Sequence, residues 1–96
     1  MEYILAHELG TSGNKATLLS TEGELIASVT YPYPTSYPYD TWVEQNPEDW
    51  WQAVIDTTRT LISGIDSRKI IGVSFSGQMM GCICVDKAGT PLRPAI

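Results

Sequence analysis

The first third of the chain has the two-residue alternation of apolar and polar positions that is typical of β-strands. An apolar segment, Tyr3–Leu9, is followed by two alternating segments, Lys15–Ser20 and Leu25–Tyr31. Turn-forming residues separate these segments at Gly10–Asn14 and at Thr21–Glu24. Because short strands joined by tight turns pair with their neighbours, we predict an antiparallel meander of three strands.

A helix is predicted after a proline-rich stretch, residues 32–46, which we expect to form an extended surface loop. Asn46 can cap the helix, Pro47 suits its first position, and two acidic residues follow. We expect the helix to end near Ser63, before Gly64. Its apolar stripe, which should cover a sheet and place Trp51 in the core, consists of Trp51, Val54, Ile55, Thr58, Leu61, Ile62 and Ile65.

Two more strands are predicted after the helix. Residues 69–75 include the continuous apolar run Ile70–Val73, a pattern that favours a central strand buried on both faces. Met80–Val85 is a second apolar segment. A crossover through the helix should place residues 69–75 parallel to the first strand. The order β-β-β-α-β-β therefore predicts an α/β fold with a mixed five-stranded sheet.

Only one helix is available to this sheet, so one of its faces lacks a cover from the chain. Exposed apolar faces and unpaired edges recruit other chains. We therefore expect self-association, in the simplest case as a homo-oligomer.

The composition excludes several functional classes. The net charge is −5, with a pI near 4.5, so the basic surface that nucleic acids or anionic lipids require is missing. No apolar run approaches the ~20 residues that cross a bilayer, and Glu2 stands where a secretory signal would carry positive charge. Cys82 and Cys84 are expected to be reduced and buried, as in a cytoplasmic protein without nucleic-acid or membrane partners.

The first segment with candidate chemistry is Glu-Leu-Gly-Thr-Ser-Gly-Asn-Lys, residues 8–15. Gly10 lets backbone N–H groups converge on an anion, the hydroxyls of Thr11 and Ser12 add donors, and Lys15 adds positive charge. Glu8 could hold a magnesium ion, directly or through water. Spacing alone favours a simpler interpretation, a hairpin turn whose Gly, Ser and Asn residues supply positive φ angles.

The second candidate segment, Ser74–Gly81, follows the predicted buried strand. Ligands of open α/β sheets bind at the carboxyl ends of parallel strands. Gln78 offers both a donor and an acceptor to a hydroxylated ligand, and Met79 and Met80 offer apolar walls. A plain strand break with methionines in the core explains the segment equally well. His7, the only histidine, is expected to be structural.

Together these segments resemble the amino-terminal end of the FGGY carbohydrate kinases, and most closely the xylulose-phosphorylating members. Glu8–Lys15 resembles the family pattern D-x-G-T-S/T-x-x-K, and Trp42–Trp51 resembles W-V-E-Q-x-P-x-x-W-W. Ile71–Met79 is similar to I-x-G-I-x-x-S-G-Q-M, and the match continues through Asp86–Ile96. The resemblance covers essentially the whole chain, with four segments in the family's order.

The resemblance implies a ribonuclease H-like domain of the actin and hexokinase type, with residues 1–96 as the amino-terminal part of the first kinase domain. It also implies ATP and Mg²⁺ as cofactors and transfer of the γ-phosphoryl group to a sugar, D-xylulose first. The alternatives are another sugar or a polyol, such as gluconate, ribulose or another ketose. The residues it places at the phosphates and magnesium are Glu8, Gly10, Thr11, Ser12 and Lys15. The residues it places at the sugar are Gln78, Met79 and Met80.

Two residues depart from the family pattern. Glu8 replaces the usual aspartate, and Met80 replaces the histidine usual in the xylulose-phosphorylating members, which leaves the sugar open. The family's general base, an aspartate further along its chains, has no counterpart here, so no catalytic residue is assigned. We therefore expect residues 1–96 by themselves to transfer no phosphate. The alternative is a non-catalytic module that uses the ATPase fold.

Overall fold

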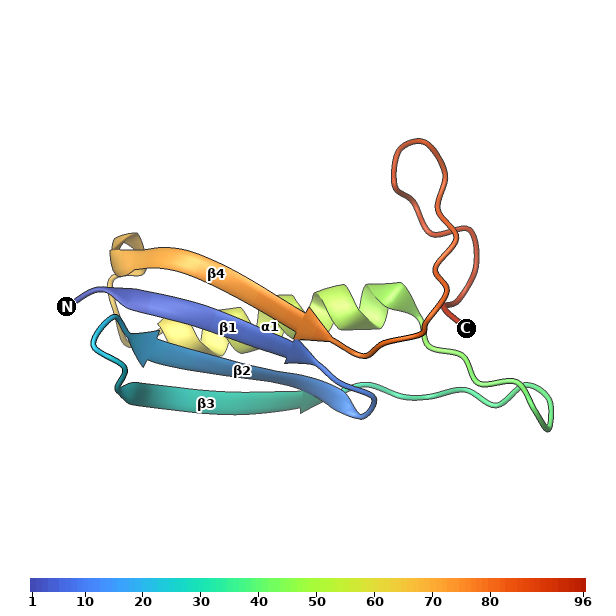
Figure 1. The fold of residues 1–96 in the computed structure, drawn as a ribbon, viewed down its shortest axis with the longest axis horizontal. Coiled ribbons are helices and arrows are strands. Elements are labelled where there is room, and N and C mark those ends of the chain that lie inside the picture. The colour runs from blue at the N-terminus through green and yellow to red at the C-terminus, as the bar shows by residue number, and fades with distance from the viewer.

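A computed structural model describes residues 1–96, which form one sheet with a helix packed on it (Figure 1). The strands are β1 (Tyr3–Leu9), β2 (Gly13–Ser20), β3 (Leu25–Pro32) and β4 (Ile70–Gly77). The helix α1 (Pro47–Ile62) lies between β3 and β4 in the chain. A short 3₁₀ turn, Ser67–Lys69, leads into β4. The structure contains no helix long and apolar enough to cross a membrane.

The strands stand in the order β3-β2-β1-β4. As predicted, β1, β2 and β3 form an antiparallel meander, and β4 pairs parallel to β1 after the crossover through α1. The mixed α/β sheet is thus confirmed, but it has four strands rather than five.

The predicted fifth strand, Met80–Val85, is not formed. The chain leaves the sheet after β4, and Met80 takes a positive φ of 66°, which turns the backbone out of the extended direction. Cys82 then exchanges two backbone hydrogen bonds with Ile96 instead of joining a strand. Figure 1 shows this last segment projecting away from the sheet. Without the strand, Cys82 and Cys84 are exposed free thiols, so their predicted burial is also wrong.

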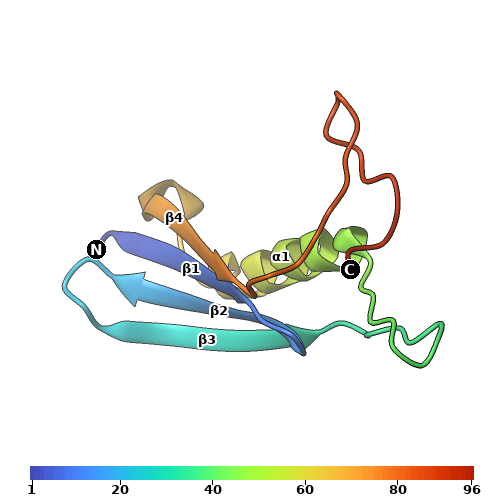
Figure 2. The same ribbon diagram turned by 45° about the vertical axis from the view of Figure 1, so that its right-hand side comes forward.

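The helix begins as expected, because the Asn46 side chain accepts a hydrogen bond from the backbone N–H of Glu48 at 3.0 Å. It covers one face of the sheet (Figure 2) and packs mainly on β2 and β3. The main core cluster consists of Leu5, Ala16, Leu18 and Leu61.

The burial of Trp51 and of β4 was predicted wrongly, for one shared reason. The helix lies over β2 and β3, so neither its flank that carries Trp51 nor the outer strand β4 is covered. Trp51 is 59% exposed. The β4 residues Val73 and Phe75 are 53% and 56% exposed, although their register with Leu5 and His7 places them on the helix side of the sheet.

A buried polar network joins this sheet to the helix. His7 is 3% exposed, and its Nδ1 accepts a hydrogen bond from the Asn14 amide at 2.9 Å. The same amide donates to Thr57 Oγ1, and His7 Nε2 lies 3.2 Å from Thr58 Oγ1. Because an amide nitrogen can only donate, the neutral imidazole carries its proton on Nε2 and donates it to Thr58. Burial lowers the pKa of His7 below its ordinary value of 6.5.

This network predicts that acid destabilises the fold through His7. Because its pKa is lowered in the folded state, its contribution is fully present above pH 6.5 and is lost as the pH falls from there toward the folded-state pKa. We expect the free energy of unfolding, measured with urea between pH 7.5 and 5.0, to fall more steeply for the native chain than for His7→Gln. Parallel pH profiles for the two chains would contradict the network.

Candidate functional site

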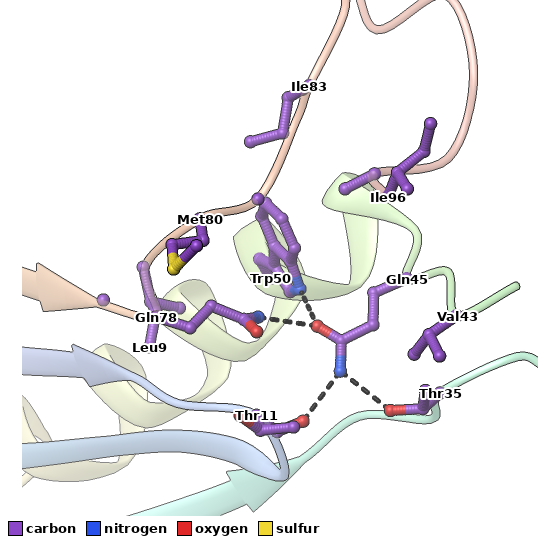
Figure 3. Close-up of a pocket in the computed structure, with 13 residues that line it drawn as sticks. Leu9, Thr11, Thr35, Val43, Gln45, Trp50, Gln78, Met80, Ile83 and Ile96 are labelled. Carbon is purple, nitrogen blue, oxygen red and sulfur yellow. Dashed lines mark hydrogen bonds between the residues drawn. The ribbon is translucent and has the colours of Figure 1, made fainter. Parts of the chain in front are cut away.

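A pocket of about 290 Å³ opens where β1 and β4 end. Its walls come from the turn after β1, the loop before α1, the first turn of α1, the segment after β4 and the last two residues (Figure 3). Thr11 from the first candidate segment and Gln78 from the second both line it. The parallel pairing explains this meeting, because Leu9 O accepts a hydrogen bond from Gln78 N at 2.8 Å, one residue beyond β4.

The turn after β1 is tight and presents its hydroxyl residues to solvent. Gly10 N donates to Gly13 O at 3.0 Å, which closes the turn and leaves Thr11 and Ser12 exposed. Neither glycine has a positive φ, contrary to the expectation for a simple hairpin turn. Gly13 is needed for another reason, because a Cβ there would lie 2.6 Å from Tyr31 O.

One residue of the loop after β3, Tyr33, holds the same turn through two hydrogen bonds. The buried Tyr33 donates its hydroxyl to Gly10 O, and its backbone N–H donates to Ser12 O at 3.2 Å. Burial raises the pKa of the Tyr33 phenol, so it remains a donor at neutral pH. The proline-rich loop, which was expected to lie on the surface, therefore also holds the candidate phosphate turn in place.

Glu8 and Lys15 lie outside the pocket, on the sheet face opposite α1. They are cross-strand neighbours in the β1–β2 pairing, and Ser76 stands beside Glu8 on β4. The alternation along β1, in which His7 faces the helix, directs Glu8 to the open face. Lys15 is exposed and forms no ion pair.

The residues around Glu8 could contact a magnesium ion, but they do not form a complete set of ligands for it. No group of three acidic, histidine or cysteine side chains gathers anywhere in the chain. Magnesium usually keeps several waters and takes one or two carboxylates together with substrate phosphates. A single exposed carboxylate beside Ser76 suits a contact through water, not a complete protein cage.

The two methionines after Gln78 are surface residues. Met79 is 87% exposed and Met80 fully exposed, so the interpretation of core methionines at a strand break is wrong. Met80 lines the pocket and holds the left-handed backbone conformation described above, which is uncommon for residues other than glycine. Strained backbone of this kind is concentrated at functional sites.

Sequence reasoning missed Gln45, the residue at the centre of the pocket. It is 7% exposed, and its carboxamide makes four hydrogen bonds (Figure 3). Its Nε2 donates to Thr11 O at 2.7 Å and to Thr35 Oγ1 at 2.9 Å. Its Oε1 accepts from Trp50 Nε1 at 2.9 Å and from Gln78 Nε2 at 2.8 Å.

Contacts beside Gln45 tie the loop before α1 to the last residues of the chain. The Gln45 backbone exchanges two hydrogen bonds with Ala95, of 3.0 and 2.7 Å, which anchors the last residues of the chain against the pocket. Glu44 forms an ion pair with Arg93, whose guanidinium lies 5.9 Å from the ring centre of Trp42. The tract from Trp42 to Trp50 is therefore an ordering element for the pocket.

Comparison with known proteins identifies the family of this chain. Residues 3–96 match the N-terminal domain of the FGGY family of carbohydrate kinases. The chain belongs to this family. The expected resemblance is thereby confirmed.

Relatives agree with the assignment. The chain is 46% identical over 90 residues to the xylulose kinase of Klebsiella pneumoniae, covering 93% of this chain and 18% of that one. It is 36% identical over 94 residues to the gluconokinase of Bacillus subtilis, covering 98% and 18%. The crystal structure of ligand-bound xylulose kinase from Lactobacillus acidophilus superimposes with a TM-score of 0.92 at 29% identity, covering 100% of this chain and 19% of that one. The fold is thus that of sugar kinases of the actin and hexokinase type, and the chain spans about a fifth of its relatives' length.

The close approach at Gly13 yields a stability prediction. Gly13→Ala should lower the free energy of unfolding by about 1–3 kcal/mol, because the new methyl group meets backbone that cannot move aside. Gly64→Ala is the matched control, since a Cβ there meets nothing within 4 Å. Urea unfolding of the three chains measures the difference, and equal stability for Gly13→Ala and Gly64→Ala would contradict the geometry.

Proposed function

We propose that this chain forms the phosphate-facing and sugar-facing part of a kinase that transfers the γ-phosphoryl group of ATP to a sugar hydroxyl. One observation carries the proposal: Thr11 and Gln78, which come from the two candidate segments, line one pocket. Phosphoryl transfer depends on positioning and on neutralising charge rather than on covalent chemistry. A pocket that takes one residue from each candidate segment supports that role.

Each candidate residue has a proposed task. The turn residues Gly10, Thr11 and Ser12 would lie along the ATP phosphates, with their N–H and hydroxyl groups as donors. Lys15, free of any ion pair, would add positive charge. Glu8 would hold Mg²⁺ through water, and the ion, when bound, neutralises phosphate charge.

The sugar would lie against Gln78, Met79 and Met80. We propose D-xylulose as the first substrate, because this chain is 46% identical to a relative named xylulose kinase. Gluconate is the principal alternative, because another relative is named gluconokinase, and ribulose or another ketose remains a further candidate. We place the protein in the cytoplasm, where ATP is supplied and the exposed thiols of Cys82 and Cys84 remain reduced.

The activity is tested by a chimera, because no general base is assigned within the chain and we expect the 96 residues by themselves to be inactive. In the chimera, this chain replaces the matching first fifth of the Klebsiella pneumoniae xylulose kinase. We expect ADP to form only when D-xylulose or another sugar is added, as measured by a coupled assay. The isolated chain should form none.

Two results would overturn these expectations. A chimera that unfolds cooperatively but phosphorylates none of D-xylulose, D-ribulose and gluconate would contradict the proposed function. Sugar-dependent ADP formation by the isolated chain would contradict its expected inactivity.

We also propose that the isolated chain self-associates through β4. Val73, on this outer strand, is about half exposed, and β4 has a free edge. In sedimentation velocity experiments, Val73→Thr should shift the chain toward the monomer, because threonine suits a strand but buries less apolar surface. Val43→Thr, at an equally exposed loop position, is the control. A native chain that is monomeric at high concentration would disprove the proposal.

A further inference from the structure

The partners of Gln45 leave its carboxamide only one orientation. The carbonyl oxygen of Thr11 can only accept a hydrogen bond, so the nitrogen of the Gln45 amide must face it. The indole N–H of Trp50 can only donate, so the oxygen of the same amide must face Trp50. Thr11 and Trp50, whose hydrogen-bonding roles are fixed, thus determine the positions of Nε2 and Oε1 of Gln45.

This orientation decides the orientation of Gln78 in turn. The atom of Gln45 that lies 2.8 Å from the Gln78 carboxamide is Oε1, which only accepts. Gln78 must therefore direct its nitrogen at Gln45. Its own Oε1 has no hydrogen-bond partner in the chain, and Gln78 lines the pocket (Figure 3).

We propose that Gln45 is a positioning residue that makes Gln78 present a hydrogen-bond acceptor to the pocket, and so selects a ligand that donates a hydroxyl at that point. The inference rests on the proposed function and deepens it by defining the polarity of the sugar subsite. Gln45 also holds the carbonyl of Thr11, so the same amide fixes the candidate phosphate turn relative to the sugar contact.

Two substitutions of Gln45 separate positioning from simple structural support. Gln45→Met fills a similar volume but makes none of the four hydrogen bonds, so Gln78 is free to rotate its amide. Gln45→Glu keeps both acceptor contacts, to Trp50 and Gln78, but loses the donor contact to the Thr11 carbonyl, which can only accept. Gln52→Met is the matched control, because Gln52 is exposed on α1 and bonds only to Asp56.

Steady-state kinetics of the chimera provide the test. For Gln45→Met we expect the KM for the sugar to rise by about tenfold, the effect of one lost hydrogen bond. Gln45→Glu should raise this KM less than Gln45→Met does, because it keeps the acceptor that orients Gln78, whereas Gln52→Met should leave it within about threefold of the native value. Monodeoxy analogues of the sugar identify the hydroxyl concerned. For the analogue that lacks the hydroxyl donated to Gln78, Gln45→Met should not raise the KM.

A double-mutant cycle with Gln78→Glu tests the orientation itself. A carboxylate at position 78 still accepts from the sugar, but it opposes the acceptor oxygen of Gln45. The rise in KM caused by Gln78→Glu should therefore be smaller in the Gln45→Met background than in the native one. If Gln45 only supports the fold, the two effects on KM multiply independently.

The outcomes distinguish this inference from the function on which it rests. An active chimera in which Gln45→Met leaves the sugar KM unchanged, or in which Gln45→Glu raises it as much as Gln45→Met does, overturns the positioning role and leaves the kinase assignment standing. Should Gln45→Met fail to unfold cooperatively in urea, Gln45→Glu and Gln78→Glu still decide the matter, since the first should raise the sugar KM less than the second does; equal rises overturn the positioning role. A folded chimera that phosphorylates no sugar overturns the function and the inference together.

Discussion

The pocket depends on one buried carboxamide with every hydrogen-bonding position filled. Gln45 donates two hydrogen bonds, to the turn after β1 and to the loop after β3. It accepts two, from the helix and from the segment after β4. A buried polar group that loses its partner costs roughly 1–3 kcal/mol, so these four segments cannot separate without a penalty. These segments are thereby held in one arrangement.

The sheet supplies the second constraint, because β1 and β4 run parallel and end together. Their adjacency places the turn after β1 beside the segment after β4, although nearly seventy positions separate these segments in the chain. The crossover through α1 creates this meeting, and Gln45 lies just before that helix begins. The topology thus brings the two candidate segments together, and the Gln45 side chain sets their relative orientation.

Local chemistry was enough to predict the meander, the helix start at Asn46 and the parallel position of β4. The errors arose at residues whose burial depends on which other elements of the fold pack against them. Trp51 and Val73 look like core residues in the sequence, yet the helix lies over β2 and β3 and leaves both exposed. Met80–Val85 has the composition of a strand, but Met80 turns the chain away from any partner.

The two candidate segments of the site were predicted, but the residue that connects them was not found. Gln45 stands within the Trp42–Trp51 motif, but a loop glutamine carries no periodicity and no charge that indicates its role. Its importance comes from partners distant in the sequence. The glycine at position 13 was anticipated, but for its φ angle rather than for the approach of Tyr31. Family resemblance supplied the candidate roles, whereas the hydrogen-bond partners supplied the orientation.

The account is tested most directly by NMR of the Gln45 side-chain amide in the 96-residue chain. Because both amide hydrogens are donated inside the structure, they should exchange slowly with solvent, and a scalar coupling should cross the hydrogen bond from Nε2 to the carbonyl carbon of Thr11. Rapid exchange at the rate of the exposed Gln52 amide, with no coupling to Thr11, would show that the carboxamide does not hold the pocket together.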